Sequence, residues 1–459
     1  MDNLADPQYG KKSFLLILCL LIALIWKLAP HPLVIIVIAL LPIALMTALS
    51  LPFMMVFFFV IFSFFRIHEV VPQLYPLKLP LLLSMASIIA LVWHIGISQK
   101  IKLWWRPELT MMLLFYLLVT IGVVMASNKG VAFAYYKGIY WKIALMSFAI
   151  AWMVSKPKDF AFASKAIVFA GLMVGLKALF NKAAGIGLVE GSRVTIGRDI
   201  GSVLGDPNDL ALVLMFPAAF AVSLILMQGI DKTTRVLSMI ALPVLFMAVL
   251  ATQSRGGLLG IMAVLAIFAY RRIHSKTLFF VIGIVAAVAL YAVAGISDRA
   301  SGGAAEAGVD ASAMGRIYAW QAAFGMAVSN PLTGVGIDNF YSNYFYYSPH
   351  WDGLNHAVHS TWFGVLAETG FLGLIVFITM ITMLIRTALR TLKRIQSDRE
   401  NISPYICATS EAVLAGLIGT LVSGTFLTFG FTWPIYILAA LILATAQWTD
   451  NHFKKKHAS

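Results

Sequence analysis

A histidine at the start of an apolar run is the clearest candidate for chemistry in this chain. His359-Ser360 ends a long polar segment and precedes a stretch of mostly apolar residues that includes Gly370 and Gly373. An imidazole titrates near neutral pH, so it can accept or release a proton under physiological conditions. A titratable group is costly to keep beside an apolar span, and such groups usually have a function. We therefore predict that His359 acts as a general base.

Three arginines could bind phosphate near this histidine. Arg255 lies in Ser254-Arg255-Gly256-Gly257, between two apolar runs, and Arg316 lies four residues before Trp320 in a segment that predicts an interfacial helix. The planar guanidinium pairs with phosphate through two parallel hydrogen bonds. Either arginine could instead contact lipid phosphate or remain solvated. Arg198 is a third candidate for the same contact.

Two further groups of residues could bind substrate. Asp206 and Asn208 flank a proline directly before an apolar run, which favours a capped helix start and leaves substrate contact as the alternative. Tyr344 and Tyr346 belong to the aromatic-rich segment 340–351. These rings could stack on sugars, or they could form an aromatic belt at a membrane interface.

The histidines and cysteines do not form a metal-binding pattern. His350, His356 and His359 are irregularly spaced and no carboxylate-rich motif accompanies them. Cys19 and Cys407 lie in or near apolar runs and give no disulfide framework. We therefore expect neither a metal ion nor another cofactor.

The composition indicates that these residues are positioned by membrane helices. The chain has 459 residues, of which 60% are hydrophobic and 12% are charged, and its mean hydropathy is +0.88. A soluble protein carries about twice that charged fraction, and a membrane barrel would alternate apolar and polar residues. We predict an all-α polytopic protein with about 14 transmembrane helices (12 to 14), placed near 13–29, 31–49, 51–66, 79–98, 107–126, 139–155, 162–182, 207–228, 234–252, 256–270, 277–295, 360–385, 405–425 and 428–448.

The distribution of charge predicts the orientation of these spans. The net charge is +14, and most connections on one side are rich in lysine and arginine, which marks that side and both termini as cytoplasmic. We therefore attribute the positive net charge to the orientation of the spans in the membrane, and we expect no nucleic-acid partner. The opposite side receives the long segments 183–206 and 296–358, and within 296–358 Arg299 and Arg316 are the only cations. We divide the chain into an N-terminal transmembrane bundle, 1–182, and a catalytic region, 183–459, that includes the outer loop 296–358.

In these motifs the chain resembles the O-antigen ligase/polymerase superfamily, a group of bacterial membrane enzymes that transfer glycans. His359-Ser360, nine residues, Gly370, two residues and Gly373 fit the ligase pattern of that superfamily. Further matches are Ser254-Arg255-Gly256, Arg316 with Trp320 followed by Asn330-Pro331 and Gly334-x-Gly336, and Asp206-Pro207-Asn208, which has Asp where the family's motif begins with Asn.

The resemblance implies a GT-C-like fold and a metal-independent transfer with inversion at the periplasmic face of the bacterial inner membrane. The implied donor is a glycan on undecaprenyl diphosphate, and the implied acceptor is lipid A–core, a protein hydroxyl or another glycan, with membrane lipid around the site. Arg255 and Arg316 would stabilise the diphosphate and His359 would take the acceptor's proton. Arg198, Asp206, Asn208, Trp320, Tyr344 and Tyr346 would bind substrate, and Glu368 would be a buried structural partner. A ligase is the leading interpretation, a polymerase is the alternative, and a polysaccharide transporter or flippase is a hypothesis of a different class.

Overall fold

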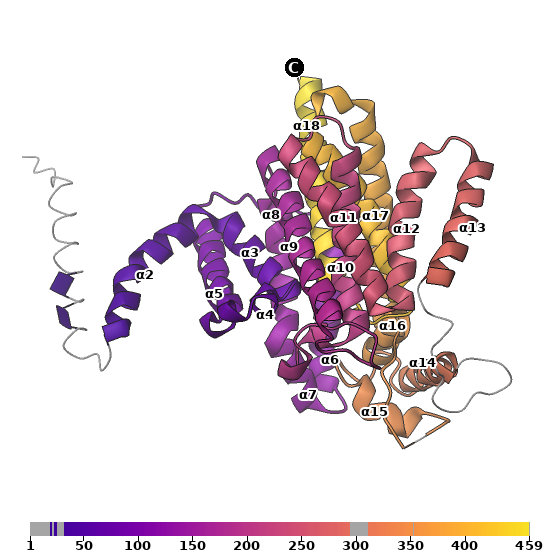
Figure 1. The fold of residues 1–459 in the computed structure, drawn as a ribbon. Helices are drawn as coiled ribbons and strands as arrows, with labels where there is room; N and C mark the ends of the chain where they lie inside the picture. The colour runs from indigo at the N-terminus through magenta and orange to yellow at the C-terminus, as the bar shows by residue number, and fades with distance from the viewer. Residues whose placement is uncertain (1–18, 21–22, 25–31, 294–310, 352, 459) are drawn as a thin grey trace, which may run out of the picture.

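The computed structural model describes residues 19–20, 23–24, 32–293, 311–351 and 353–458. Within these ranges the chain is helical and forms no β-strand (Figure 1), and its one β-bridge joins Val189 to Arg193. The prediction of an all-α protein is therefore confirmed. The predicted first span, 13–29, lies almost entirely outside the described residues.

The helices follow the apolar runs of the sequence. In chain order they are α2 (Pro32–Ser50), α3 (Pro52–Phe64), α4 (Ile67–Val70), η1 (Pro72–Leu77), α5 (Leu79–Val92), η2 (Trp93–Ile97), α6 (Pro107–Met125), α7 (Lys129–Tyr135), η3 (Tyr136–Tyr140), α8 (Trp141–Met153), α9 (Pro157–Ala184), η4 (Arg198–Ile200), η5 (Val203–Gly205), α10 (Pro207–Leu226), α11 (Lys232–Thr252), α12 (Arg255–Arg272), α13 (Lys276–Val293), α14 (Ala311–Ser329), α15 (Phe340–Tyr347), α16 (Thr361–Ser397), η6 (Arg399–Asn401), α17 (Pro404–Gly424) and α18 (Trp433–Ala458).

Several of these helices can cross a membrane, which makes the chain a polytopic membrane protein. Among the described residues, seven helices are long and apolar enough, or eight if one bent pair counts as a span. This count does not reach the predicted fourteen. The predicted spans 31–49 and 51–66 correspond to that bent pair, because Leu40–Ser50 and Pro52–Phe64 meet at 98°. They are therefore two arms of one bent unit.

Helices α10 and α17 lie at the centre of the bundle, and glycines allow their neighbours to approach closely. A Cβ atom on Gly260 of α12 would lie 2.1 Å from the Met215 sulfur of α10, and one on Gly419 of α17 would lie 2.9 Å from the Gly260 carbonyl oxygen. Small residues at such crossings let helix backbones approach and gain van der Waals contact, which is the main attraction between helices in lipid. One hydrophobic core extends across the predicted boundary at 182/183, and that domain division remains a prediction.

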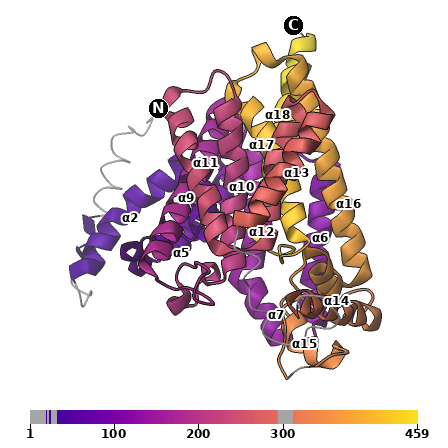
Figure 2. The same cartoon turned by 45° about the vertical axis from the view of Figure 1, so that its right-hand side comes forward.

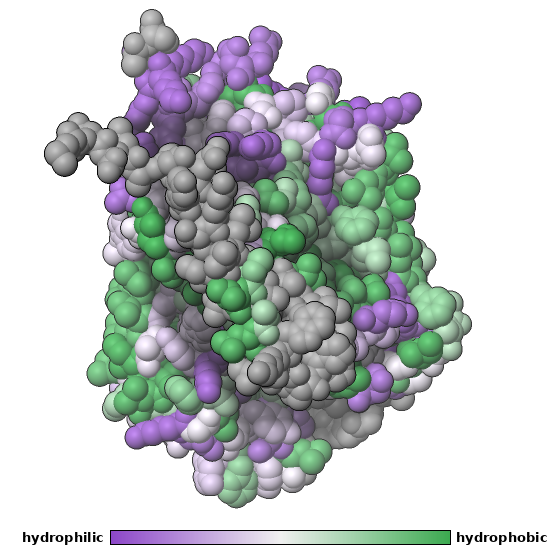
Figure 3. Space-filling model, turned by 90° about the vertical axis from the view of Figure 1, so that its left-hand side faces the viewer, coloured by the Kyte–Doolittle hydropathy of each residue, from purple (hydrophilic) through white to green (hydrophobic). Residues whose placement is uncertain are grey.

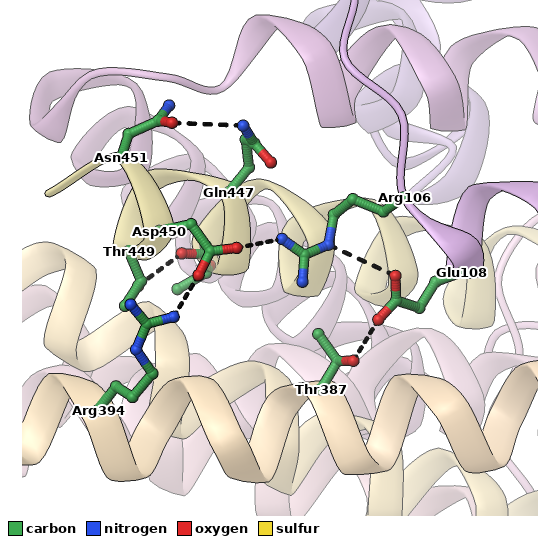
Figure 4. A network of polar contacts seen from close by, with 9 residues as sticks. Arg106, Glu108, Thr387, Arg394, Gln447, Thr449, Asp450 and Asn451 are labelled. Carbon is green, nitrogen blue, oxygen red and sulfur yellow. Dashed lines mark hydrogen bonds and ion pairs between the residues drawn. The ribbon is translucent and has the colours of Figure 1, made fainter. Parts of the chain in front are cut away.

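The basic end of the bundle is held together by ion pairs (Figure 4). The Arg106 guanidinium donates to the Asp450 carboxylate at 2.5 Å, and Arg394 of α16 pairs with the same carboxylate. Arg106 also bonds to Glu108, which accepts from the Thr387 hydroxyl. The start of α6, the last turns of α16 and the second half of α18 therefore meet at one end, as the clustering of cations in the sequence predicted. On the face shown in Figure 3, hydrophilic side chains gather above a mainly hydrophobic middle.

The opposite end carries the residues that the sequence singled out. Helices α14 and α15 lie across this end beneath the bundle, and α16 starts beside them (Figures 1 and 2). Helices α10 and α12 also begin at this end, each after a connection that lies there.

Candidate active site

Helix α16 is broken nine residues after its start, at a glycine of the predicted motif. Gly370 has φ +69° and ψ −172°, a backbone region that is open essentially to glycine alone. The break divides α16 into a short arm, residues 361–369, and a long arm, residues 371–397. Only Ser360, the N-cap residue, separates the short arm from His359.

A segment from the preceding loop fills this break. The segment 330–336, which we call the wedge, places its Val335 N–H on the Ala367 carbonyl oxygen at 2.9 Å, and its Pro331 carbonyl oxygen accepts from the Phe371 N–H at 2.8 Å. These bonds satisfy backbone groups that lose their helical partners at the break. A Cβ atom on Gly370 would lie 2.5 Å from the Pro331 oxygen, and one on Gly334 would lie 2.3 Å from the Ala367 oxygen. Gly370 and Gly334, from two different motifs, therefore both allow the backbones of the wedge and α16 to approach closely.

Glu368 connects the short arm to α15. Its side chain is 8% exposed, and its Oε1 accepts the Phe340 N–H at the start of α15 at 3.2 Å. A carboxylate in this place satisfies a backbone donor that has no partner within the helix. The structural role predicted for Glu368 is confirmed by this contact.

His359 has a left-handed backbone conformation, with φ +44°. Such a conformation is uncommon for a residue other than glycine, and it persists only where the surroundings hold it. The indole N–H of Trp320 donates to the Val358 carbonyl oxygen at 3.1 Å, and the Trp320 ring stacks on Phe363 at 5.0 Å. The Ser360 hydroxyl caps the short arm. Trp320 therefore positions the residues on both sides of His359.

The electrostatic surroundings favour the neutral imidazole of His359. Burial lowers the pKa of His359 from its ordinary value of 6.5, and the Arg316 guanidinium lowers it further. The Asp206 carboxylate raises this pKa, while His356 and Arg193 again lower it. Since a lowered pKa leaves the ring unprotonated near neutral pH, His359 is in the form that can accept a proton.

The connection between α17 and α18, residues 425–432, contacts all three parts of the candidate site. The Thr361 hydroxyl of the short arm donates to the Leu427 carbonyl oxygen at 2.8 Å. The Arg316 guanidinium carbon lies 5.9 Å from the centre of the Phe426 ring. A Cβ atom on Gly256, the residue after Arg255, would lie 3.4 Å from the Phe426 Cβ. We call residues 425–432 the hub loop, because it adjoins the segments that carry His359, Arg316 and Arg255.

Arg255 is the first residue of α12, at a helix start fixed by hydrogen bonds. The Ser254 hydroxyl accepts the Gly257 N–H at 3.2 Å and donates to the Asn208 side-chain oxygen at 2.9 Å. A Cβ atom on Gly257 would lie 2.5 Å from the Ala211 Cβ, so α12 and α10 are closely packed here. The start of a helix carries partial positive charge, which adds to the charge of Arg255 and favours an anion.

Asp206 and Asn208 have the structural roles that the sequence favoured, and Asn208 has a second one. The Asp206 carboxylate accepts the Asn208 N–H at 2.7 Å and caps α10. The Asn208 side chain accepts from Ser254 and from Arg193, the latter at 3.2 Å. Asn208 therefore ties the starts of α10 and α12 together. Asp206 in addition contributes its charge to the environment of His359.

Two functional positions were not found from the sequence. Arg193 is buried, and its Nε donates to the Thr252 carbonyl oxygen at 3.2 Å. Its signal was its position as a cation in the outer segment 183–206. Phe426 belongs to a connection for which the hydropathy pattern allowed only two residues, and the structure gives it eight, Thr425–Thr432, between the end of α17 and the start of α18.

The structure places the remaining predicted binding residues differently. Tyr344 is 1% exposed and packs against His356, with ring centres 5.3 Å apart, so its ring cannot stack on a sugar in this structure, and the prediction of direct contact is corrected. Tyr346 is 75% exposed. Arg198 is exposed in η4 and donates to the Gly205 carbonyl oxygen at 3.3 Å, a contact within its own connection. In the described ranges, no three or more His, Cys, Asp or Glu side chains group as metal ligands do.

One comparison with known proteins gave a match, and it covers most of the candidate site. Residues 240–378 match a family model described as O-antigen ligase. The match covers less than half of the chain, but it includes Arg255, Arg316, His359 and the break in α16. A search of curated proteins gave no significant match. Over residues 240–378 the chain is similar to the O-antigen ligase family, which supports its resemblance to the O-antigen ligase/polymerase superfamily.

Proposed function

We propose that the protein is a membrane glycosyltransferase that moves a glycan from undecaprenyl diphosphate to an acceptor hydroxyl at the periplasmic face of the bacterial inner membrane. The observation that carries this proposal is the placement of His359. Its strained backbone, its lowered pKa and its proximity to Arg316 together describe a positioned base beside a fixed cation. The family match supports glycan transfer in general.

The proposed reaction has one bond-forming and one bond-breaking event at the same carbon. A ring nitrogen of His359 takes the proton of the acceptor hydroxyl while its oxygen attacks the anomeric carbon of the donor sugar. The bond from that carbon to the diphosphate oxygen breaks, and undecaprenyl diphosphate leaves with its electron pair. Attack from the side opposite the leaving group inverts the anomeric centre. General base catalysis of this kind contributes roughly 10²- to 10⁴-fold.

The two arginines are proposed to stabilise the diphosphate. Negative charge grows on the leaving group in the transition state, and each preorganised contact to such charge is worth about 3–4 kcal/mol. Arg316 of α14 lies over the Phe426 ring of the hub loop, and Gly256, the residue after Arg255 in α12, adjoins the same phenylalanine. Fixed guanidinium groups can supply this charge without a metal ion, so we propose a metal-independent reaction.

The remaining site residues are proposed to position these three. Trp320 holds the backbone around His359, and Asn208 with Arg193 holds the start of α12. Tyr346 offers an exposed ring to a glycan, and Arg198 is retained only as an outer phosphate contact.

Two alternative functions differ in how far they use the same features. A polymerase would take the same donor, with another lipid-linked glycan as its acceptor, and the site residues would be the same. A transporter would place its functional polar groups near the membrane midplane, whereas here they lie at one end of the bundle. A ligase therefore remains the leading proposal, on a GT-C-like scaffold with about fourteen crossings and both termini in the cytoplasm.

A reconstituted transfer assay tests the proposal. Purified protein is supplied with undecaprenyl-diphosphate-linked glycan and separately with lipid A–core, a protein acceptor, or more donor. We expect transfer to lipid A–core or protein, and loss of transfer in Arg255→Gln, Arg316→Gln and His359→Gln. Arg390→Gln, at the basic end, is the matched control. Chain extension on the donor alone would favour the polymerase, and full activity of the three site variants would reject this site.

A further inference from the structure

A second hollow lies at the basic end, away from the candidate active site. Its volume is about 1060 Å³, and it lies between the bent pair α2/α3, η2, the connections to α6 and α9, and α18. None of the candidate catalytic residues lines it. The proposed transfer reaction therefore does not account for it.

Positive charge dominates the polar part of this cavity. Four lysines contribute to the lining, namely Lys100, Lys102, Lys156 and Lys158, and all four are exposed. The one carboxylate of the lining, Asp159, accepts the N–H groups of Ser155 and Lys156 at 3.2 and 2.8 Å. That carboxylate is thus engaged with backbone, and the balance of charge favours an anion.

The rest of the lining is aromatic and aliphatic. Four tryptophans are present, Trp93, Trp104, Trp152 and Trp448, and the Trp152 indole donates to the Trp104 carbonyl oxygen at 2.9 Å. Tryptophan and lysine together are typical of the level at which lipid headgroups lie. Basic pockets between helices at this level bind phosphate headgroups.

One wall of the cavity is fixed by a buried histidine. His94 is 3% exposed, and its two ring nitrogens bond to the Leu49 carbonyl oxygen and the Ser98 hydroxyl, each at 2.7 Å. Leu49 lies just before the 98° bend between α2 and α3. The bond to Leu49 joins the bend to η2, so the cavity is bounded by a defined contact.

An apolar track leads from the bundle surface to this cavity. On α5 the side chains of Leu82, Met85, Ile89 and Val92 are exposed, and their spacing of three or four residues puts them on one helix face. The face ends at Trp93, which lines the cavity. A ligand that fits both parts has an anionic head and apolar chains.

We propose that this cavity binds the phosphate headgroup of an anionic glycerophospholipid, with its acyl chains along the exposed face of α5. The lysines neutralise the phosphate, the tryptophans border the glycerol region, and the apolar track receives the chains. This site is separate from the candidate active site and does not depend on the proposed function.

Native mass spectrometry of the full-length protein in neutral detergent tests the proposal. Phosphatidylglycerol and phosphatidylcholine with identical acyl chains are titrated separately. We expect one phosphatidylglycerol to bind about tenfold more tightly than phosphatidylcholine, because each lysine near an anionic headgroup contributes to binding. Equal retention of the two lipids by the wild-type protein would overturn the proposal.

Paired substitutions locate the binding. Lys100→Gln/Lys102→Gln and Lys156→Gln/Lys158→Gln should each remove this preference, whereas Lys100→Arg/Lys102→Arg should keep it. The matched control, Lys454→Gln/Lys455→Gln, removes two exposed charges at the same end but outside the cavity. An equal loss in this control would show binding by general charge and reject the site. Displacement of phosphatidylglycerol by millimolar sn-glycerol 3-phosphate would instead assign the cavity to a soluble phosphate and reject the lipid.

Discussion

Replacement of Gly370 by alanine tests whether the wedge positions His359. The new methyl group would lie 2.5 Å from the Pro331 carbonyl oxygen, and a carbon–oxygen contact needs about 3.3 Å. The wedge and the short arm must therefore separate by about 0.8 Å, and the backbone at φ +69° adds about 1–3 kcal/mol of strain for a residue with a side chain. Misplacement of a catalytic group by about 1 Å can cost roughly 100-fold in rate.

We therefore expect Gly370→Ala to lower kcat/KM for glycan transfer about 100-fold and to lower the temperature of unfolding. Transfer is measured with purified protein and lipid-linked donor, and unfolding is followed in the same detergent. Gly283→Ala in α13 is the control, because a Cβ atom there would meet no neighbour within 4 Å. A Gly370→Ala protein with wild-type kcat/KM would refute the idea that the wedge sets the position of His359.

Four other predictions concern the same site. His359→Gln should abolish transfer while His350→Gln, whose ring packs on a tyrosine away from the break, should retain most of it; equal losses in a parallel assay would remove His359 from its role. Asp206→Asn keeps the helix cap but removes a negative charge that raises the pKa of His359. This pKa should therefore fall and the acid limb of the kcat/KM profile should move to lower pH, whereas a shift to higher pH would contradict the proposed effect of Asp206 on His359. Trp320→Phe keeps the ring stack but loses the bond to Val358, worth about 1 kcal/mol, so kcat/KM should fall about fivefold, and an unchanged value would show that this bond does not matter. EDTA should leave the rate unchanged, and inhibition reversed by a divalent ion would reject the metal-independent mechanism.

The helical class and the main site residues could be predicted from the sequence because each has a local signal. Apolar length predicts helices that cross a membrane, and the seven found by length and composition all coincide with predicted spans. The cap at Asp206 and the buried role of Glu368 followed from residue type and spacing. The spacing between His359 and Gly370 was also visible, although its physical reason was not.

The break itself could not be predicted, because its cause lies elsewhere in the chain. Thr369-Gly370-Phe371 continues an apolar helical pattern, and a single glycine does not end a helix by its composition. Only the docking of the wedge gives Gly370 its φ of +69°. The burial of Tyr344 could not be predicted either, because an aromatic-rich segment does not indicate which of its rings are covered by the fold.

Most of the hub loop was hidden for a related reason. Phe429 and Phe431 are apolar, so hydropathy alone starts the next span at 428 and leaves only 426–427 as the connection. The chain leaves the helix there because this connection packs on the short arm, where a Cβ atom on Gly430 would lie 2.4 Å from a Val365 methyl group. Hydropathy measures apolar length, and it does not report which helix the apolar groups contact.

The hub loop also sets the order in which the protein can become active during its synthesis. The wedge leaves the ribosome before α16 does, so the break has its partner as soon as α16 is made. Phe426 and Leu427, in contrast, follow every other element of the candidate site in chain order. A nascent chain that has inserted α16 still has no ring beneath Arg316 and no acceptor for the Thr361 hydroxyl. The candidate site is therefore assembled only after the hub loop has been made, because these two contacts come from Phe426 and Leu427.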